Sequence, residues 1–203
     1  MSAHGNDFIP LTLANAGVCC YHPRMKSRIC LAIGIAVMVL LPSTALPQSA
    51  ENRWGAAVRF NAGHGDRQDV PFDGDWSYGL VYEYREPQAY FQLVMSYAGK
   101  VSFTNEFDGK SGAIEAIWTP EFNIMFTQSS WAGGLGVLKH LVRREDGGVW
   151  SPVFWQFLVG LNLGQRSAIA LDLMACYQFE SWGEVKEINI RDVDIRISVT
   201  HAF

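Results

Sequence analysis

The feature that most constrains the fold of this chain is an alternation of apolar and polar residues that recurs throughout the part after residue 50. In the first such stretch, Trp54 and Phe60 share one side while Arg59 lies on the other. Because successive side chains of a strand point to opposite faces, this pattern predicts β-strands. Eight stretches show it: residues 54–62, 76–85, 90–97, 114–126, 131–142, 155–163, 168–178 and 194–203. Helical periodicity is scarce, so the sequence predicts an all-β protein.

The connections between the predicted strands alternate between long and short. Long connections are predicted at residues 63–74, 101–110 and 180–187, short ones at 86–88, 127–130 and 164–166, and an intermediate one at 143–148. Tight turns at one end and longer polar loops at the other are typical of barrels that cross the bacterial outer membrane. We therefore predict an eight-stranded antiparallel up-and-down transmembrane β-barrel.

The end of the chain supports closure of this barrel. The last ten residues, DIRISVTHAF, alternate up to the terminal Phe203. A chain end that makes no contacts frays, because nothing offsets the entropy lost on ordering it. We therefore expect the last strand to pair with the first, which leaves no free sheet edge.

Alternation alone does not say which face meets solvent, so composition must decide. The less hydrophobic face is rich in Gly, Ala, Ser, Asn and Gln and carries few charges, whereas the other face is apolar with aromatic residues near strand ends. Small residues and paired charges suit the filled interior of a narrow barrel, and terminal aromatic rings suit lipid interfaces. The alternative is a soluble periplasmic barrel that binds a small apolar ligand and points the aromatic face inward.

Charged residues on the predicted inner face are candidates for a lumen charge network. Each would need an opposite charge, because an isolated buried charge is costly. The candidates are Arg59, Glu83, Arg85, Glu115, Asp172, Asp192, Asp194 and Arg196. Two further features concern the backbone: Pro120 predicts a bulge or break, and Gly134 and Gly136 are expected to make room for interior side chains.

The segment before residue 51 is predicted to direct export. Residues 25–50 have a basic start, an apolar stretch of 13 residues and small residues afterwards, which is the layout of a signal peptide. The apolar stretch is shorter than the roughly 20 residues a spanning helix needs. Cleavage is expected after Ala45 or Ala50. Residues 1–24 are then an upstream extension or precede the true start at Met25, and residues 51–203 form the barrel.

Charge and cysteine content exclude some classes of partner and linkage. Residues 51–203 carry 19 Asp and Glu against 13 Lys and Arg, a net charge of −6. Nucleic acid is therefore not an expected partner. Cys176 is the only cysteine after residue 50, so no internal disulfide is expected there.

These features together resemble the small eight-stranded outer-membrane barrels of Gram-negative bacteria, in the OmpA/OmpX-type class. The resemblance covers residues 53–203 and implies that Phe203 serves as an assembly signal read by the barrel-assembly machinery, with outer-membrane lipid as a further partner. The stretch GGLGVLKH and the later VGLNLGQRSAIALDLMACYQF are also similar in layout to lipid A deacylase barrels. Where those enzymes carry His-x-Ser, this chain has Ala175-Cys176-Tyr177-Gln178.

The sequence points to no catalytic, cofactor-binding or metal-binding residue. His64 lies beside Asp66 and Asp69, but one nitrogen ligand makes a solvated loop the better interpretation. His140 is assigned a hydrogen-bonding role in the lumen or at its rim, and Cys176 a packing role. The predicted function is a non-enzymatic, cell-envelope surface protein that acts through its extracellular loops, with an unidentified loop partner. A lipid A-modifying acyl hydrolase of the deacylase type is the alternative.

Overall fold

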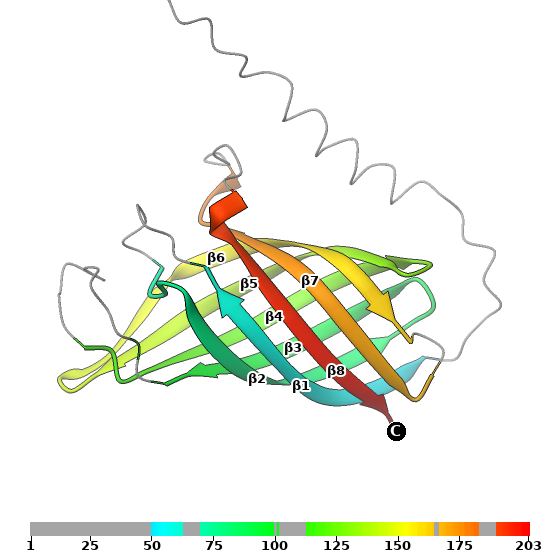
Figure 1. Ribbon diagram of the computed structural model, residues 1–203, viewed down its shortest axis with the longest axis horizontal. Coiled ribbons are helices and arrows are strands. Elements are labelled where there is room, and N and C mark those ends of the chain that lie inside the picture. The colour runs from blue at the N-terminus through cyan, green and yellow to red at the C-terminus, as the bar shows by residue number, and fades with distance from the viewer. Residues whose placement is uncertain (1–49, 63–69, 100, 102–112, 165–166, 183–189) are drawn as a thin grey trace, which may run out of the picture.

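The computed structural model of this chain describes residues 50–62, 70–99, 101, 113–164, 167–182 and 190–203. Eight strands wind into a single closed barrel in sequence order (Figure 1). They are β1 (Glu51–Asn61), β2 (Asp75–Arg85), β3 (Ala89–Ala98), β4 (Ala116–Gln128), β5 (Trp131–Arg144), β6 (Gly147–Leu163), β7 (Ile169–Phe179) and β8 (Val193–Ala202). Every neighbouring pair is antiparallel, which confirms the predicted eight-stranded up-and-down topology.

Closure is made by β8 and β1. Arg53 pairs with Ala202 at one end of this ladder and Phe60 pairs with Ile195 at the other. The Phe203 backbone N–H also donates to the Asn52 carbonyl oxygen at 3.3 Å. The chain end is therefore held by the ladder, as the alternation up to Phe203 predicts, and the strand order leaves no sheet edge unpaired.

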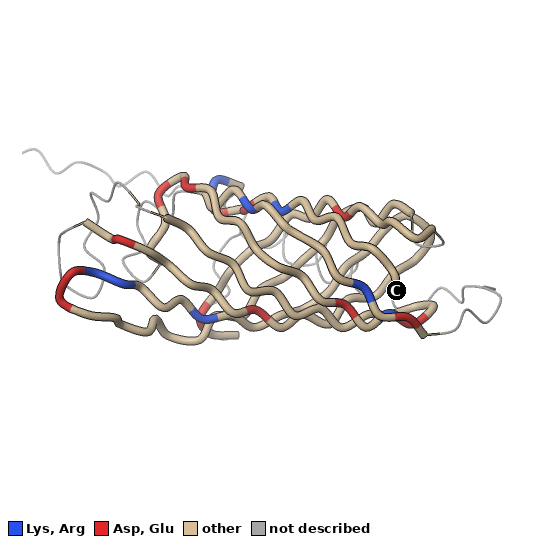
Figure 2. The backbone as a smooth tube through the Cα atoms, turned by 90° about the horizontal axis from the view of Figure 1, so that it is seen from below, with Lys and Arg blue, Asp and Glu red and all other residues tan. Residues whose placement is uncertain are grey.

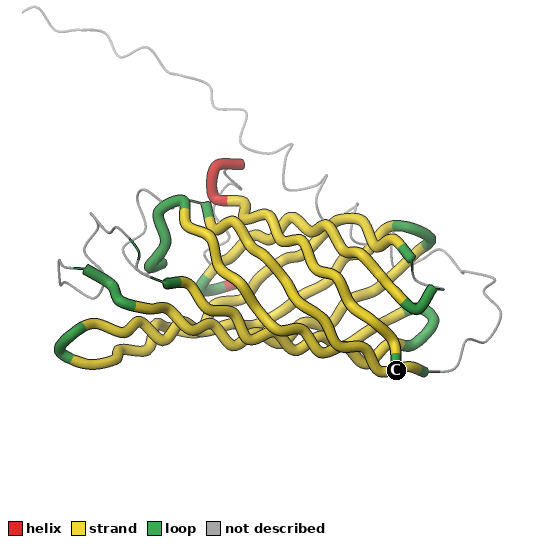
Figure 3. Tube along the Cα trace, turned by 60° about the horizontal axis from the view of Figure 1, so that its bottom comes forward, coloured by secondary structure: helices red, strands yellow, loops and turns green. Residues whose placement is uncertain are grey.

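The two ends of the barrel differ. One end, here called the turn end, carries the C-terminus and the tight connections after β2, β4 and β6 (Figures 1 and 3). The opposite end, here called the loop end, carries the connections after β1, β3 and β7. The 3-10 turn η2 (Ile190–Asp192) leads into β8 at the loop end.

The connection between β5 and β6 differs from the expected intermediate loop. Both strands continue through residues 143–148 and are joined by a turn of only Glu145 and Asp146. Gly147 follows with φ of +139°, a conformation that favours glycine. The β5–β6 hairpin consequently extends beyond the neighbouring strands (Figure 1).

Apolar side chains cover the outside of the barrel. Large hydrophobic residues remain exposed on every strand, with Trp54 at 55%, Leu80 at 66% and Ile169 at 59% relative exposure. The inward positions instead bury arginines, carboxylates and amides. Charged positions are sparse along the strands in Figure 2. This distribution is the inverse of a water-soluble barrel, whose apolar side chains point inward.

The predicted irregularity at Pro120 takes a limited form. β4 continues through Pro120, and its ladder with β5 is interrupted at Thr119 and Pro120 before resuming in the same register. The register shift lies instead between β5 and β6, at Ser151 and Pro152 opposite His140. There the Ser151 hydroxyl accepts the His140 backbone N–H at 2.8 Å, so a side chain supplies the bond that the bulge removes from the ladder.

Among the described residues, no helix has the length and apolar character needed to cross a membrane.

Candidate functional site

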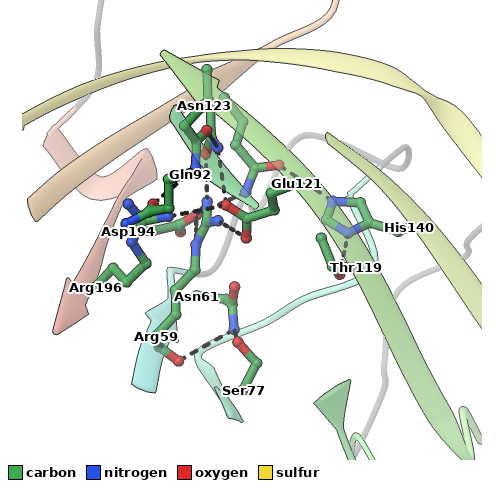
Figure 4. Close-up of polar contacts among 12 residues, drawn as sticks. Arg59, Asn61, Ser77, Gln92, Thr119, Glu121, Asn123, His140, Asp194 and Arg196 are labelled. Atoms are coloured by element: carbon green, nitrogen blue, oxygen red, sulfur yellow. Dashed lines mark hydrogen bonds and ion pairs between the residues drawn. The ribbon is translucent and has the colours of Figure 1, made fainter. Parts of the chain in front are cut away.

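The most densely bonded part of the molecule lies inside the barrel and is centred on Arg59 of β1 (Figure 4). Its Nη1 donates to Glu121 Oε1 on β4 at 2.8 Å, and its Nη2 donates to Asp194 Oδ2 on β8 at 2.6 Å. Nη2 also lies 3.4 Å from Gln156 Oε1 on β6. One guanidinium group thus joins four strands from different sides of the lumen.

Arg196 of β8 is the second cation of this central network. It is the direct cross-strand partner of Arg59, and its Nη1 donates to Glu121 Oε2 at 3.2 Å. Gln156 donates to the same carboxylate oxygen at 3.0 Å. Within the described residues, Nε and Nη2 of Arg196 and the hydroxyl of Ser198 are buried without a hydrogen-bond partner. The Arg196 guanidinium is therefore less fully bonded than that of Arg59.

Asp194 connects the central network to the backbone. Its Oδ1 accepts the Ala62 backbone N–H at 2.7 Å, just after the end of β1. Its Oδ2 accepts from Arg59 and, at 2.7 Å, from the Gln178 amide of β7. This carboxylate therefore holds the loop end of β1 against β8 and β7.

A second group of polar residues, the turn-side cluster, lies around Arg85 of β2. Arg85 Nη2 is 2.8 Å from Glu83 Oε2 and 3.6 Å from Asp172 Oδ2. Its Nη1 donates to Asn162 Oδ1 at 2.9 Å, and Asn162 also contacts Asp172. The guanidinium carbon lies 4.2 Å from the centre of the Tyr90 ring, a cation–π arrangement.

Three amide side chains inside the barrel join the turn-side cluster to the central network. Gln92 of β3 donates to Glu83 Oε1 at 2.9 Å. The Asn123 amide of β4 lies 3.1 Å from Gln92 and 2.7 Å from Gln156, whose amide reaches Glu121. The carboxylates of the two groups are thus linked through three amides into one continuous network.

Arg53 adds a further buried cation near the turn end. It forms an ion pair with Glu51 on the same strand, and its Nη2 donates to the Ser167 carbonyl oxygen at 2.8 Å. Including Arg53, the buried Arg, Asp and Glu side chains of the described residues number four arginines and four carboxyl groups: Arg53, Arg59, Arg85, Arg196, Glu83, Glu121, Asp172 and Asp194. The interior is therefore close to neutral, as the cost of burying an unpaired charge requires.

The loop end of the lumen is apolar rather than charged. A loop-end cluster is formed by Val70, Phe72, Ala98, Val101, Ile114, Ile117, Leu138, Val142 and Phe154. Phe72 belongs to the segment between β1 and β2 and is 1% exposed, so this connection inserts a ring into the cluster. The cluster caps the polar network on the loop side.

His140 lies at the boundary between the loop-end cluster and the polar network. Its ring centroid is 5.3 Å from that of Phe72 and 5.4 Å from that of Phe154. Its Nδ1 is 2.9 Å from Thr119 Oγ1 and its Nε2 is 3.3 Å from Gln178 Oε1 (Figure 4). These contacts place His140 in the lumen, hydrogen-bonded on both ring nitrogens and covered by aromatic rings.

The structure places six of the eight predicted network residues inside the barrel and two outside it. Glu115 is exposed because β4 begins at Ala116, and both Ile114 and Ile117 are buried, so the alternation does not extend back to Glu115. Asp192 is half-buried because it ends the η2 turn and precedes β8. Glu115 and Asp192 therefore do not belong to the lumen network.

Two buried charged residues were not among the candidates, although the sequence contained a signal for each. Glu121 shares the inward side of β4 with Thr119 and Asn123, and its central role depends on which residues face it across the lumen. Arg53 lies one residue before the stretch 54–62. It is two residues from Gly55 and so shares the inward side of β1. The alternation within residues 114–126 already places Glu121 on the inward side, and extending the first stretch by one residue includes Arg53.

The remaining candidates for chemistry are buried or lie outside the described residues. His64 with its neighbours Asp66 and Asp69 lies outside them. Cys176 is fully buried next to Met174 and Leu158. Within the described part of the chain, no group of three or more His, Cys, Asp or Glu side chains is arranged to hold a metal ion.

The network joins strands from different sides of the barrel. Its carboxylates and most of its guanidinium nitrogens are used on protein partners that come from β1, β2, β4, β6, β7 and β8. Hydrogen bonds to charged groups are stronger than neutral ones, and they are stronger still away from water. The arrangement ties opposite walls together and fills the space between them.

No model of a known protein family matches this chain, and no curated protein sequence matches it. Among solved structures, the crystal structure of Neisserial surface protein A aligns with 78% of this chain and 100% of its own length, at 14% sequence identity and a TM-score of 0.46. The barrel topology itself follows from the strand pairing described above.

Proposed function

We propose that this protein is a non-enzymatic barrel of the Gram-negative outer membrane, which acts as a structural or surface-interaction protein through its loop end. The observation that carries the proposal is the distribution of side chains between the two faces of the wall. Of the charged residues in the eight described strands, only Lys139 and Arg143 occupy outward positions. The other outward positions form an apolar surface that encircles the barrel, which suits lipid better than water.

The lumen supports this proposal against the soluble alternative. A soluble barrel that carries an apolar ligand needs an open, apolar cavity inside. Here Arg59, Glu121, Gln156 and Asp194 meet across the centre of the lumen, and the loop-end cluster fills the space on the loop side. The lumen is therefore filled by side chains that contact one another from opposite walls, which favours the membrane barrel over the soluble ligand carrier.

The region that resembles lipid A deacylases favours a non-enzymatic role. An enzyme that cleaves acyl chains needs a nucleophile within reach of the lipid and of a base. On β7, Cys176 and Gln178 are buried in the lumen, whereas Ala175 and Tyr177 occupy the outward positions. Cys176 is therefore separated from the outer surface by the barrel wall.

By resemblance, assembly in the outer membrane would involve recognition of Phe203 by the barrel-assembly machinery. Phe203 is 73% exposed and follows the last ladder pair of β8. A ring in this position is available to a partner at the turn end, which is the end that would face the periplasm if the loops face outward.

The proposal is tested by expressing the chain in a Gram-negative host, separating inner membrane, outer membrane and periplasm, and comparing boiled with unboiled samples by gel mobility. We expect the protein in the outer-membrane fraction, with a shift in mobility on boiling because a closed barrel resists detergent unfolding. A soluble periplasmic protein without a mobility shift would contradict the proposal. A known outer-membrane barrel and a known periplasmic protein of the host serve as controls for the fractions.

A further inference from the structure

Two basic side chains lie on the otherwise apolar outer surface, and both belong to the half of β5 that is nearer the loop end. Lys139 is half-buried, Arg143 is exposed, and they are four residues apart on the same outward side. No carboxylate of the described residues lies within ion-pair distance of either one. Cations on an apolar outer wall that have no carboxylate counterion among the described residues suit a counterion of another kind.

The position of Lys139 along β5 matches the border of an apolar membrane layer. Nine to eleven tilted strand residues cross such a layer, and Trp131 at the turn end to Lys139 is a run of nine residues. Trp131 is 53% exposed and belongs to the aromatic residues expected at the opposite interface. Lys139 therefore lies near the depth of the lipid headgroups on the loop side.

The bulge in β6 determines where the Lys139 ammonium group lies. Because the register shifts at Ser151 and Pro152, Lys139 pairs with Val153 while Leu141 pairs with Trp150. The Lys139 Nζ lies 5.5 Å from the centre of the Trp150 ring. Since Trp150 is nearer the loop end than Lys139, the ammonium group is directed toward the headgroups, as lysines at membrane borders are.

We infer that Lys139 and Arg143, with Trp150 supporting the Lys139 side chain, form a docking site for the phosphate of an anionic lipid headgroup on the outer wall of β5 and β6. This inference rests on the proposed membrane location. Two cations of the same sign on an apolar surface complement a lipid whose phosphate carries the negative charge and whose chains cover the neighbouring apolar side chains. Glu115 just before β4 donates its backbone N–H to the Arg143 carbonyl oxygen at 2.9 Å, but its carboxylate forms no ion pair with Arg143 or Lys139.

The test uses the full protein purified from membranes in detergent, stripped of lipid and placed in phosphatidylcholine vesicles or nanodiscs with increasing phosphatidylglycerol. Retained lipid is counted by native mass spectrometry. We expect phosphatidylglycerol to be retained in preference to phosphatidylcholine. A basic residue near a lipid surface contributes about fivefold to such binding, so Lys139→Gln and Arg143→Gln should each weaken it about fivefold and the double variant about 25-fold.

Two control variants separate the site from general surface charge. Lys139→Arg keeps the cation and should retain the preference. Arg191→Gln removes an exposed cation from η2 at the same end of the barrel and should change retention less than twofold. An equal loss of phosphatidylglycerol retention in Arg191→Gln and Lys139→Gln would overturn the inference. Equal retention of phosphatidylglycerol and phosphatidylcholine by the unmodified protein would also overturn it.

Failure of the site is distinguishable from failure of the membrane proposal. Insertion into pure phosphatidylcholine needs only the apolar outer surface, so insertion without a lipid preference contradicts the docking site alone. A protein that inserts into neither lipid contradicts the membrane proposal, and the docking site with it.

Discussion

Arg59 on β1 and Arg196 on β8 are direct cross-strand partners, and Glu121 on β4 accepts a hydrogen bond from each of them across the lumen. Like charges directly opposite each other destabilise a sheet. The seam where the barrel closes therefore depends on a carboxylate supplied by a strand that is adjacent to neither β1 nor β8.

Replacing Glu121 tests this dependence. Glu121→Gln leaves two buried arginines opposite each other without their shared counterion, and we expect a loss of about 3–5 kcal/mol in the free energy of unfolding. Glu115→Gln is the matched control, because it makes the same change at an exposed position just before the same strand and should stay within about 0.5 kcal/mol. Urea titration of the protein in detergent, followed by the unboiled gel band, measures both. Equal losses in the free energy of unfolding for Glu121→Gln and Glu115→Gln would contradict the central role of Glu121.

The two arginines are expected to differ in importance. Arg59→Met removes hydrogen bonds to Glu121, Gln156 and Asp194 and should cost about 3–5 kcal/mol. Arg196→Met removes one hydrogen bond to Glu121 together with two buried nitrogens that lack partners among the described residues, so its cost should be at least about 2 kcal/mol smaller. The same titration compares them, and an equal or larger loss in Arg196→Met would show that its guanidinium has partners of comparable strength.

A charge on the outer wall distinguishes lipid from water as the surroundings of the barrel. Leu80 lies at the middle of β2 and is 66% exposed. In a bilayer Leu80→Arg should lower the free energy of unfolding by about 2–4 kcal/mol, because a cation at the midplane is costly. In water the same change at an exposed position would stay within about 0.5 kcal/mol. Denaturant titration of both proteins in phosphatidylcholine vesicles provides the measurement.

The absence of a side chain at Gly136 of β5 leaves room for the network. A Cβ atom there would overlap the Asn123 side-chain oxygen and approach the Phe122 carbonyl oxygen at 2.9 Å. We expect Gly136→Ala to destabilise the barrel by about 1–3 kcal/mol through overpacking. In Gly148→Ala the nearest atom is a flexible Leu141 methyl at 3.4 Å, so this control should be nearly neutral. If Gly136→Ala is equally neutral, the Asn123 amide is free to move aside.

Removal of the terminal ring separates assembly from stability. Phe203 is 73% exposed, so Phe203→Ala should change the free energy of unfolding of the refolded protein by less than about 0.5 kcal/mol. If Phe203 is an assembly signal, the same variant should reach the outer membrane in cells in clearly lower amount. Quantitative blotting of the outer-membrane fraction measures this, with Ile190→Ala as a control at the loop end that removes another exposed apolar side chain. An unchanged yield would remove the assembly role from Phe203.

The alternation in the sequence was sufficient to predict the strands and to say which residues share a face of each strand. Alternation along eight stretches predicts the strands, and the ladder between β8 and β1 agrees with the alternation that continues to Phe203. This works because the side-chain period of a strand is a local property, readable from neighbours two residues apart. The same reasoning placed His140 in the lumen or at its rim, and the structure buries it inside the barrel.

Local alternation reaches its limit where a strand begins or its ladder is interrupted. Glu115 was assigned to the lumen by extending the β4 pattern backwards, but Ile114 and Ile117 are both buried and the parity changes between them. Likewise the bulge opposite His140 arises at Ser151 and Pro152 and not at Pro120. Strand ends and bulges depend on neighbouring strands, which a single stretch of sequence does not contain.

The sequence by itself determined eight strands, each with an apolar and a polar face, because each residue's side of a strand is set by its immediate neighbours. The structure shows that the polar face is the inward one along most of the barrel. Only the tertiary structure decided that Glu121 lies between Arg59 and Arg196, and that Lys139 lies over Trp150. Contacts across a lumen and across a bulge depend on register and on the stagger of the closed sheet. These are relationships between strands that are far apart in the chain, so they exist only once the barrel has closed.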